Sequence, residues 1–204
     1  MNPEWNALQA TVLKATQQPV LVRSWQRDAV QLLLLHVGVA MAAVAMATFG
    51  LEHPPHVRLP SFLLLALTVV LMVIWAVAPA SRARRWGLVA LSTALAAAAA
   101  HVAAFSLGEE SPFLANGGCA FAEVTIAALP GAATLMTLRT FAYHRARAVA
   151  AGLAAACTGW VVLDLTCPAL GLAHALSFHV APLALLVLVI GTVRARLAST
   201  TFVP

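Results

Sequence analysis

The sequence predicts an all-α membrane protein with six transmembrane helices, and its composition and charge pattern lead to this prediction. The chain has 204 residues, of which 62% are hydrophobic and only 9% are charged. A soluble domain carries about a quarter charged residues, so this chain has too few charges to cover a surface that faces water. Its apolar residues gather into six long runs, with the basic residues in short clusters between them. Lipid is therefore the expected solvent for most of the chain.

The first element is a polar N-terminal segment, residues 1–28. Trp5, Leu8 and Val12 follow one another at helical spacing and would form one apolar stripe. Because so short a helix is marginal alone in water, we expect a partner surface of lipid headgroups or protein to order it. A removable signal peptide is not expected, because the first long apolar run begins only near Ala29 and no small-residue cleavage site follows it.

The first three spans are separated by breaks of different kinds. Residues 29–50 are long enough to cross the hydrocarbon core of a bilayer, and the prolines of 51–60 separate them from the second span, 61–78. The basic cluster 81–86 is predicted to be a turn. It precedes the third span, 87–107, whose alanine-rich centre favours packing against neighbouring helices over contact with lipid.

The last three spans carry signals for helix contact. The fourth, residues 121–138, contains Pro130, which is expected to kink the helix because a proline frees a backbone carbonyl. The fifth, 148–164, follows a basic turn and places small residues at every fourth position, a pattern for close helix contact (Ala148, Gly152 and Ala156). After a short loop, 165–174, comes the sixth span, 175–193. The six spans form one transmembrane domain over residues 29–196, with a tail at 197–204.

The basic residues predict the orientation of the bundle. If the N-terminus lies inside, an even number of spans returns the C-terminus to the same side. Of the 12 basic residues, 11 then lie inside and Arg58 alone lies outside. The positive-inside rule therefore predicts an N-in, C-in, multi-pass protein of the bacterial inner (cytoplasmic) membrane. The same placement argues against a DNA-binding stripe, so no direct nucleic-acid partner is expected.

The cysteines are the first candidates for chemistry. On this topology Cys119 and Cys167 lie at the outer face, whereas Cys157 lies within the fifth span. Outside the cytoplasm disulfides can form and persist. Two interpretations stay open: a plain stabilising disulfide between adjacent loops, or a sensor that responds to oxidants or metal ions.

Two carboxylates accompany these cysteines. Glu123 lies four residues after Cys119, hence on the same helix face and one turn deeper, and Asp164 lies three residues before Cys167. Carboxylates at this depth are costly unless paired or hydrated, which makes both candidates for supporting a sensor. The alternative is that both side chains simply reach outward to the membrane interface.

Histidines in the outer half of the bundle could complete a metal site. Among them, His101 belongs to the third span, His179 to the sixth, and His174 is the last residue of the loop before the sixth span. Thiolate and imidazole ligands suit zinc, copper or cadmium, so the expected cofactor is at most a transient metal ion held by Cys119, Cys167 and His174. No diagnostic metal spacing such as CxxC or HExxH is present.

Enzyme motifs are missing from the sequence. It contains no nucleotide-binding loop, no serine–histidine–acid arrangement and no haem CxxCH motif. A transport function is not favoured either, because the sequence has no internal repeat and no series of acidic residues across the membrane. His36, in the first span, is expected to be hydrogen-bonded inside the bundle.

The C-terminal half, about residues 117–196, carries a series of single-residue features along its three spans. They are Cys119, Pro130, Leu138-Arg139, Gly152, Cys167-Pro168, His174, His179 and Gly191 through Arg194. In these features the chain resembles the negative regulator of sigma-F (NrsF-like) family of bacterial six-span membrane anti-sigma factors.

The resemblance implies a partner and a signal. It implies that the N-terminal segment holds an extracytoplasmic-function sigma factor at the membrane. We expect Trp5, Leu8 and Val12 to contact this sigma factor. It also implies that the outer pair Cys119 and Cys167 senses metal or oxidative stress and triggers release of the sigma factor, which would activate a transcriptional stress response. The chain is thus expected to be a regulator and not an enzyme.

Two alternatives from other classes stay open. One is a membrane thiol oxidoreductase, whose outer cysteines would exchange disulfides with a substrate protein and pass electrons to a quinone or haem. The other is a purely structural membrane subunit.

Overall fold

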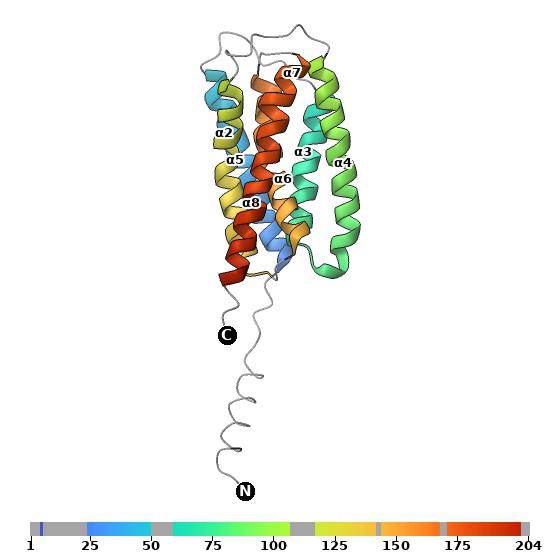
Figure 1. Ribbon diagram of the computed structural model, residues 1–204, viewed down its shortest axis with the longest axis vertical. Coiled ribbons are helices and arrows are strands. Elements are labelled where there is room, and N and C mark those ends of the chain that lie inside the picture. Colours follow the sequence, from blue (N-terminus) through green and yellow to red (C-terminus); the bar gives the residue numbers. More distant parts are fainter. Residues whose placement is uncertain are drawn as a thin grey trace.

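The computed structural model describes residue 5 and residues 24–49, 59–106, 117–141, 144–167 and 171–200. Within these ranges all regular structure is helical and no strand occurs. Six helices are long and apolar enough to cross a membrane by length and composition. They stand side by side and run alternately up and down in one bundle (Figure 1). For the described residues, the prediction of an all-α fold with six helices that could span a membrane is confirmed. The side of the membrane that each end faces stays a prediction.

The element bounds differ modestly from the predicted spans. The elements are α2 (Trp25–Phe49), α3 (Leu59–Val77), α4 (Ala80–Ser106), α5 (Gly117–Leu138), α6 (Arg145–Thr166), α7 (Leu172–Ala175), the π-helix η2 (Leu176–Val180) and α8 (Ala181–Thr200). The sixth span is thus assembled from α7, η2 and α8, and it extends into the predicted tail.

One predicted turn is wrong. The basic cluster Ser81–Trp86 forms the first turns of α4. Pro79 ends the preceding connection, and its carbonyl accepts the backbone amides of Arg82 and Ala83 at 2.9 and 3.0 Å. Alanine and arginine are strong helix formers, and no glycine or proline interrupts them before Gly87. Positive charge alone therefore does not make this segment a turn.

Helix α6 is the centre of the bundle and packs against α2, α3, α5 and α8. In the most apolar stretch of α6, 78% of the residues are buried. The small side chains of α6 let the neighbouring helices approach closely. A Cβ added at Gly152 would lie 2.8 Å from the Val187 Cα atom of α8. Ala148 and Ala156 are buried beside it, which confirms the predicted small-residue contact face.

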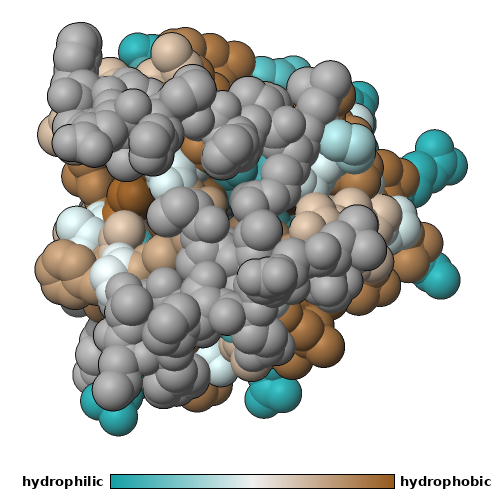
Figure 2. Space-filling view, turned by 90° about the horizontal axis from the view of Figure 1, so that it is seen from above, coloured by the Kyte–Doolittle hydropathy of each residue, from teal (hydrophilic) through white to brown (hydrophobic). Residues whose placement is uncertain are grey.

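The expectation for the alanine-rich third span is not met. Helix α4 lies at the edge of the bundle, and only 22% of its most apolar stretch is buried. Leu88 and Leu95 are 67% and 72% exposed on it. Position in the bundle, rather than alanine content, decides which helix is buried. Figure 2, which looks down on one end of the molecule, shows hydrophobic side chains at the outer rim of the described part.

The two ends of the bundle differ in charge. All nine arginines of the described ranges lie at or next to the start of α2, α4 or α6 or the end of α5 or α8. These helix ends share one side, because the helices alternate in direction (Figure 1). Cys119, Cys167 and His174 lie at the opposite end, where α5 begins, α6 ends and α7 begins. The structure therefore separates the basic clusters from the outer-face candidates by the length of the helices.

Candidate functional site

Four side chains form a thiol–imidazole cluster at the end of the bundle away from the arginines. The cluster consists of Cys119, Cys167, His174 and His179, whose four ligand atoms all lie within 4.8 Å of one another. The two Sγ atoms are 3.1 Å apart. The Nε2 atom of His174 lies 3.3 Å from the Cys167 Sγ atom and 3.0 Å from the Nε2 atom of His179. Cys119 is half-buried and the other three are buried.

Local backbone features bring these side chains together. Cys119 lies in the first turn of α5, and Cys167 caps the C-terminus of α6 by donating its amide to the Leu163 carbonyl at 2.8 Å. Gly171 begins the return of the chain to α7 with a φ of 108°, a conformation that glycine adopts without strain. Its amide donates to the carbonyl of Phe105 at 2.9 Å, which fixes α7 against the end of α4.

The π-helix places the two histidines on one face. His174 and His179 are five residues apart, and in a regular α-helix such residues point about 140° away from each other. The wider turn of η2, which closes i→i+5 hydrogen bonds, returns His179 to the side of His174. Such π segments are frequent at functional sites.

A second buried network adjoins the cluster. Asp164 of α6 accepts hydrogen bonds from the Ser61 hydroxyl at 2.9 and 2.8 Å, one on each carboxylate oxygen. The Nδ1 atom of His101 lies 3.0 Å from the Asp164 Oδ1 atom. All three side chains are buried, so this carboxylate does not reach outward to the interface, and it connects α3, α4 and α6.

Ring contacts join the network to the cluster. The His101 ring stacks on Trp160 with centroids 4.6 Å apart and lies 5.1 Å from the His179 ring. Phe105 contacts His101, His174 and His179 at 4.4, 6.1 and 5.1 Å. The cysteines, the histidines and Asp164 therefore form one continuous buried region.

Glu123 lies one turn below Cys119 and is fully buried, so it too does not extend to the interface. Neither carboxyl oxygen has a hydrogen-bond partner within the described ranges. A Cβ added at Gly159 would lie 2.8 Å from the Glu123 Cγ atom and 2.8 Å from its backbone oxygen. Glycine at 159 thus creates the space that α5 occupies beside α6.

Deeper in the bundle, His36 joins three helices as expected. Its Nδ1 atom lies 2.6 Å from the Thr158 hydroxyl of α6, and its Nε2 atom lies 3.5 Å from the Thr134 hydroxyl of α5. Cys157 is buried in α6 and does not belong to the cluster.

The four cluster atoms fit a tetrahedral metal ion. Zinc binds sulfur at about 2.3 Å and imidazole nitrogen at about 2.0–2.1 Å, so neighbouring ligand atoms in a tetrahedron are about 3.3–3.8 Å apart. The three close distances, 3.0–3.3 Å, would have to expand by roughly 0.3–0.7 Å to reach this range. The other three pairs lie within 4.8 Å and would have to adopt the same range. The Nδ1 atoms of His174 and His179 find no partner within the described ranges.

The structure places every predicted site residue that lies within the described ranges. It brings Cys119, Cys167 and His174 together and adds His179 as a fourth ligand. His101 and Asp164 form the adjoining network, and Glu123 stands apart from both. Trp5 is 64% exposed, while Leu8 and Val12 lie outside the described residues.

Several structurally important residues were not predicted. Ser61, Trp160, Gly159 and Gly171 carry no motif, and each matters only through a neighbour that is distant in sequence. Gly159 in an otherwise apolar run was the one available signal, because a glycine within a helix often marks a close approach.

Comparisons with known proteins found one relative. The chain is similar to Carotenogenesis protein CarR of Myxococcus xanthus, with 28% identity over 187 residues that cover 90% of this chain and 83% of that protein. No protein-family profile matches the chain, and no solved structure matches it.

Proposed function

We propose that this multi-pass membrane protein is an anti-sigma factor of the bacterial inner membrane. Its N-terminal segment would hold an extracytoplasmic-function sigma factor, and the thiol–imidazole cluster would trigger release in response to metal or oxidative stress. The anti-sigma role rests on the resemblance to the NrsF-like family, and the similarity to a carotenogenesis protein extends over 90% of the chain. The observation that carries the sensing role is the cluster, in which four reactive groups lie within 4.8 Å.

The charge separation supports a sensor that faces away from the cytoplasm. If the arginine-bearing end is cytoplasmic, as the positive-inside rule favours, the N-terminal segment lies beside the transcription machinery. The cluster then lies at the outer end, where disulfides can form. Signal input and sigma-factor binding would be separated by the thickness of the membrane.

Two chemical triggers fit the cluster. A peroxide could oxidise Cys119 and Cys167: the S–S bond forms as two thiol protons and two electrons pass to hydrogen peroxide, which becomes two water molecules. Alternatively, zinc or cadmium could bind both thiolates and both imidazoles. Either event would tie the start of α5 to the end of α6, and metal would also engage η2.

Helix α6 offers a physical connection from the cluster to the N-terminal segment. It carries Asp164 near one end and Thr158, the partner of His36, two turns deeper. His36 belongs to α2, which begins at Trp25 and so includes the last residues of the N-terminal segment. A shift of α6 would therefore change the packing of α2, which is a hypothesis about coupling that measurements must test.

A transcription assay tests the anti-sigma role. The chain is co-expressed with each extracytoplasmic-function sigma factor of its source organism and a matching promoter reporter. We expect one sigma factor to be repressed by the full chain and released when residues 2–17 are deleted, with the protein still in the membrane. If no sigma factor is repressed, or if the deleted chain represses equally, the assignment is wrong.

The sensing role has a separate test with a matched control. Replacement of Cys119 and Cys167 by serine should abolish induction by peroxide or cadmium without changing membrane insertion. Replacement of Cys157, which lies outside the cluster, should leave induction unchanged. Normal induction in the double variant would refute the sensor while leaving the anti-sigma role standing.

A membrane thiol oxidoreductase is the second candidate, because two thiols 3.1 Å apart are placed for disulfide exchange. Burial of Cys167, which is 5% exposed, weighs against attack by a protein substrate. Absorbance spectra of the purified chain that reveal bound quinone or haem would favour this candidate over the sensor.

A further inference from the structure

A cavity of about 360 Å³ lies at the arginine end of the bundle, far from the thiol–imidazole cluster. It lies between α4 and the start of α6, with α3 contributing one wall. Its lining includes Trp75, Arg84, Leu88, Leu91, His144 and Arg147. Its volume is in the range of small-molecule sites, about 300–1,000 Å³.

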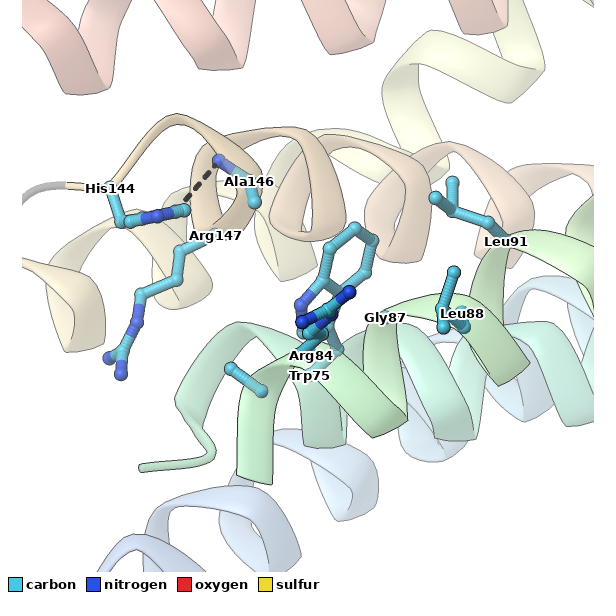
Figure 3. Close-up of a pocket in the computed structure, with 9 residues that line it drawn as sticks. Trp75, Arg84, Gly87, Leu88, Leu91, His144, Ala146 and Arg147 are labelled. Atoms are coloured by element: carbon cyan, nitrogen blue, oxygen red, sulfur yellow. Dashed lines mark hydrogen bonds between the residues drawn. The ribbon is translucent and has the colours of Figure 1, made fainter. Parts of the chain in front are cut away.

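The cavity is polarised along its length. Figure 3 shows His144 and Arg147 at one end and Leu88 and Leu91 at the other, with Arg84 and Trp75 overlapping in the view between them. The Arg147 guanidinium points away from Arg84 in this view. Its lining contains basic groups and no acidic side chain. A ligand that matches this pattern has an anionic head and an apolar tail.

Arg147 is positioned to meet an anion. One terminal nitrogen, Nη2, donates to the Ala78 carbonyl at 2.7 Å, and the guanidinium lies 5.0 Å from the centre of the Phe141 ring. The other, Nη1, is buried and has no hydrogen-bond partner within the described ranges. A buried donor on a charged group is costly to leave unpaired, and a phosphate oxygen would satisfy it.

Gly87 gives the cavity its shape. A Cβ at this position would lie 2.7 Å from the Trp75 indole, so glycine lets the indole form the wall beside Arg84. Leu88 and Leu91 are 67% and 40% exposed on α4, which lies at the edge of the bundle (Figure 1). The apolar end of the cavity therefore borders a surface that acyl chains would cover in a membrane.

From these features we infer that the cavity binds an anionic phospholipid. The phosphate lies at the basic part of the cavity, which both Arg84 and Arg147 line, and an acyl chain runs along Leu88 and Leu91. Basic pockets between transmembrane helices are known to bind anionic headgroups, and the polarity of this cavity follows the direction of a lipid from headgroup to tail. The inference does not depend on the proposed anti-sigma role.

Lipid retention on the purified full-length chain tests the inference. The chain in detergent is titrated with phosphatidylglycerol or phosphatidylcholine, and bound lipid is counted by native mass spectrometry. We expect preferential retention of phosphatidylglycerol. Arg84→Gln should weaken the binding of phosphatidylglycerol roughly fivefold, and the double variant Arg84→Gln with Arg147→Gln should weaken it about 25-fold. The reason is that each arginine near an anionic lipid contributes about 1 kcal/mol, which is roughly a factor of five in affinity.

A charge-matched control separates this cavity from general basicity. Arg82 and Arg85 are exposed arginines of the same turns and do not line the cavity. Arg82→Gln with Arg85→Gln should leave retention unchanged. The inference would be overturned if both lipids were retained equally or if Arg84→Gln bound phosphatidylglycerol as well as the unchanged chain. It would also be overturned if the control variant lost as much phosphatidylglycerol as the Arg84 variant. Because Arg84 is exposed, its replacement reports on binding even if loss of Arg147 impairs folding.

Discussion

Replacement of Gly159 by alanine tests whether α5 and α6 approach as closely as the structure indicates. The added Cβ would lie 2.8 Å from the Glu123 Cγ and backbone oxygen atoms and 3.1 Å from its Cα atom. Two of these three atoms belong to the backbone of α5, so a side-chain rotation cannot relieve the contact. Helix α5 must move, and Cys119 moves with it.

The magnitude follows from two opposing terms. Excess volume in a well-packed core costs about 1–3 kcal/mol, whereas glycine to alanine within a helix gains up to about 1 kcal/mol. Gly191→Ala isolates the second term, because no atom lies within 4 Å of a Cβ added there. The two variants should therefore differ by about 1–3 kcal/mol, with Gly159→Ala the less stable.

Thermal unfolding in detergent, read by circular dichroism, measures this difference. For a chain of this size it corresponds to a midpoint for Gly159→Ala about 2–10 °C below that of Gly191→Ala. Gly159→Ala should also slow peroxide-induced linkage of Cys119 to Cys167, followed by thiol alkylation. Equal midpoints and equal linkage rates in the two variants would refute the close packing of α5 on α6.

Three further predictions concern the same end of the bundle. Asp164→Ala should lower the free energy of unfolding, measured with denaturant, by about 3–5 kcal/mol, because it leaves buried polar partners unpaired. Combined with His101→Phe, it should lower this free energy by less than the sum of the two single effects. Strictly additive effects would contradict the pairing of Asp164 with His101. Glu123→Met should be neutral or stabilise by about 1–3 kcal/mol in the same assay, since it removes buried oxygens without partners, and a loss of stability would reveal a partner. Gly171→Ala should cost about 1–3 kcal/mol of backbone strain and reduce zinc protection of the cluster thiols against maleimide, and unchanged protection would contradict the role of this turn.

The buried polar contacts converge on α6. Thr158 contacts His36 of α2, and Asp164 contacts Ser61 of α3 and His101 of α4. In a bilayer the hydrophobic effect does not draw helices together, so small-residue packing and polar contacts of this kind carry much of the association. This explains why the most buried helix is also the one with the most polar connections.

The lipid-spanning architecture was readable from the sequence. Low charge, six apolar runs and basic clusters between them depend on local composition, because each span must by itself satisfy its backbone and match the bilayer. Boundaries were less certain: the arginines of Ser81–Trp86 continue α4, since charge does not prevent a helix from extending beyond the membrane core.

The candidate site was only partly predictable. Cys119 and Cys167 could be assigned to one end of the bundle, because alternating spans fix the side on which each connection lies. His179 as a fourth ligand could not be predicted, because its direction depends on the π-helix Leu176–Val180. That segment has no local sequence signal that we recognise.

The sequence by itself thus determined the number of spans, the segregation of arginines from cysteines, and the residue types available for chemistry, all of which are properties of single segments. Only the tertiary structure decided that α6 rather than α4 lies at the centre, that Asp164 pairs with Ser61 and His101, and that four ligand atoms meet within 4.8 Å. These outcomes depend on how helices rotate and approach one another. Rotation and approach are set by pairs of residues as far apart in the chain as Gly159 and Glu123 or Ser61 and Asp164, which no local pattern records.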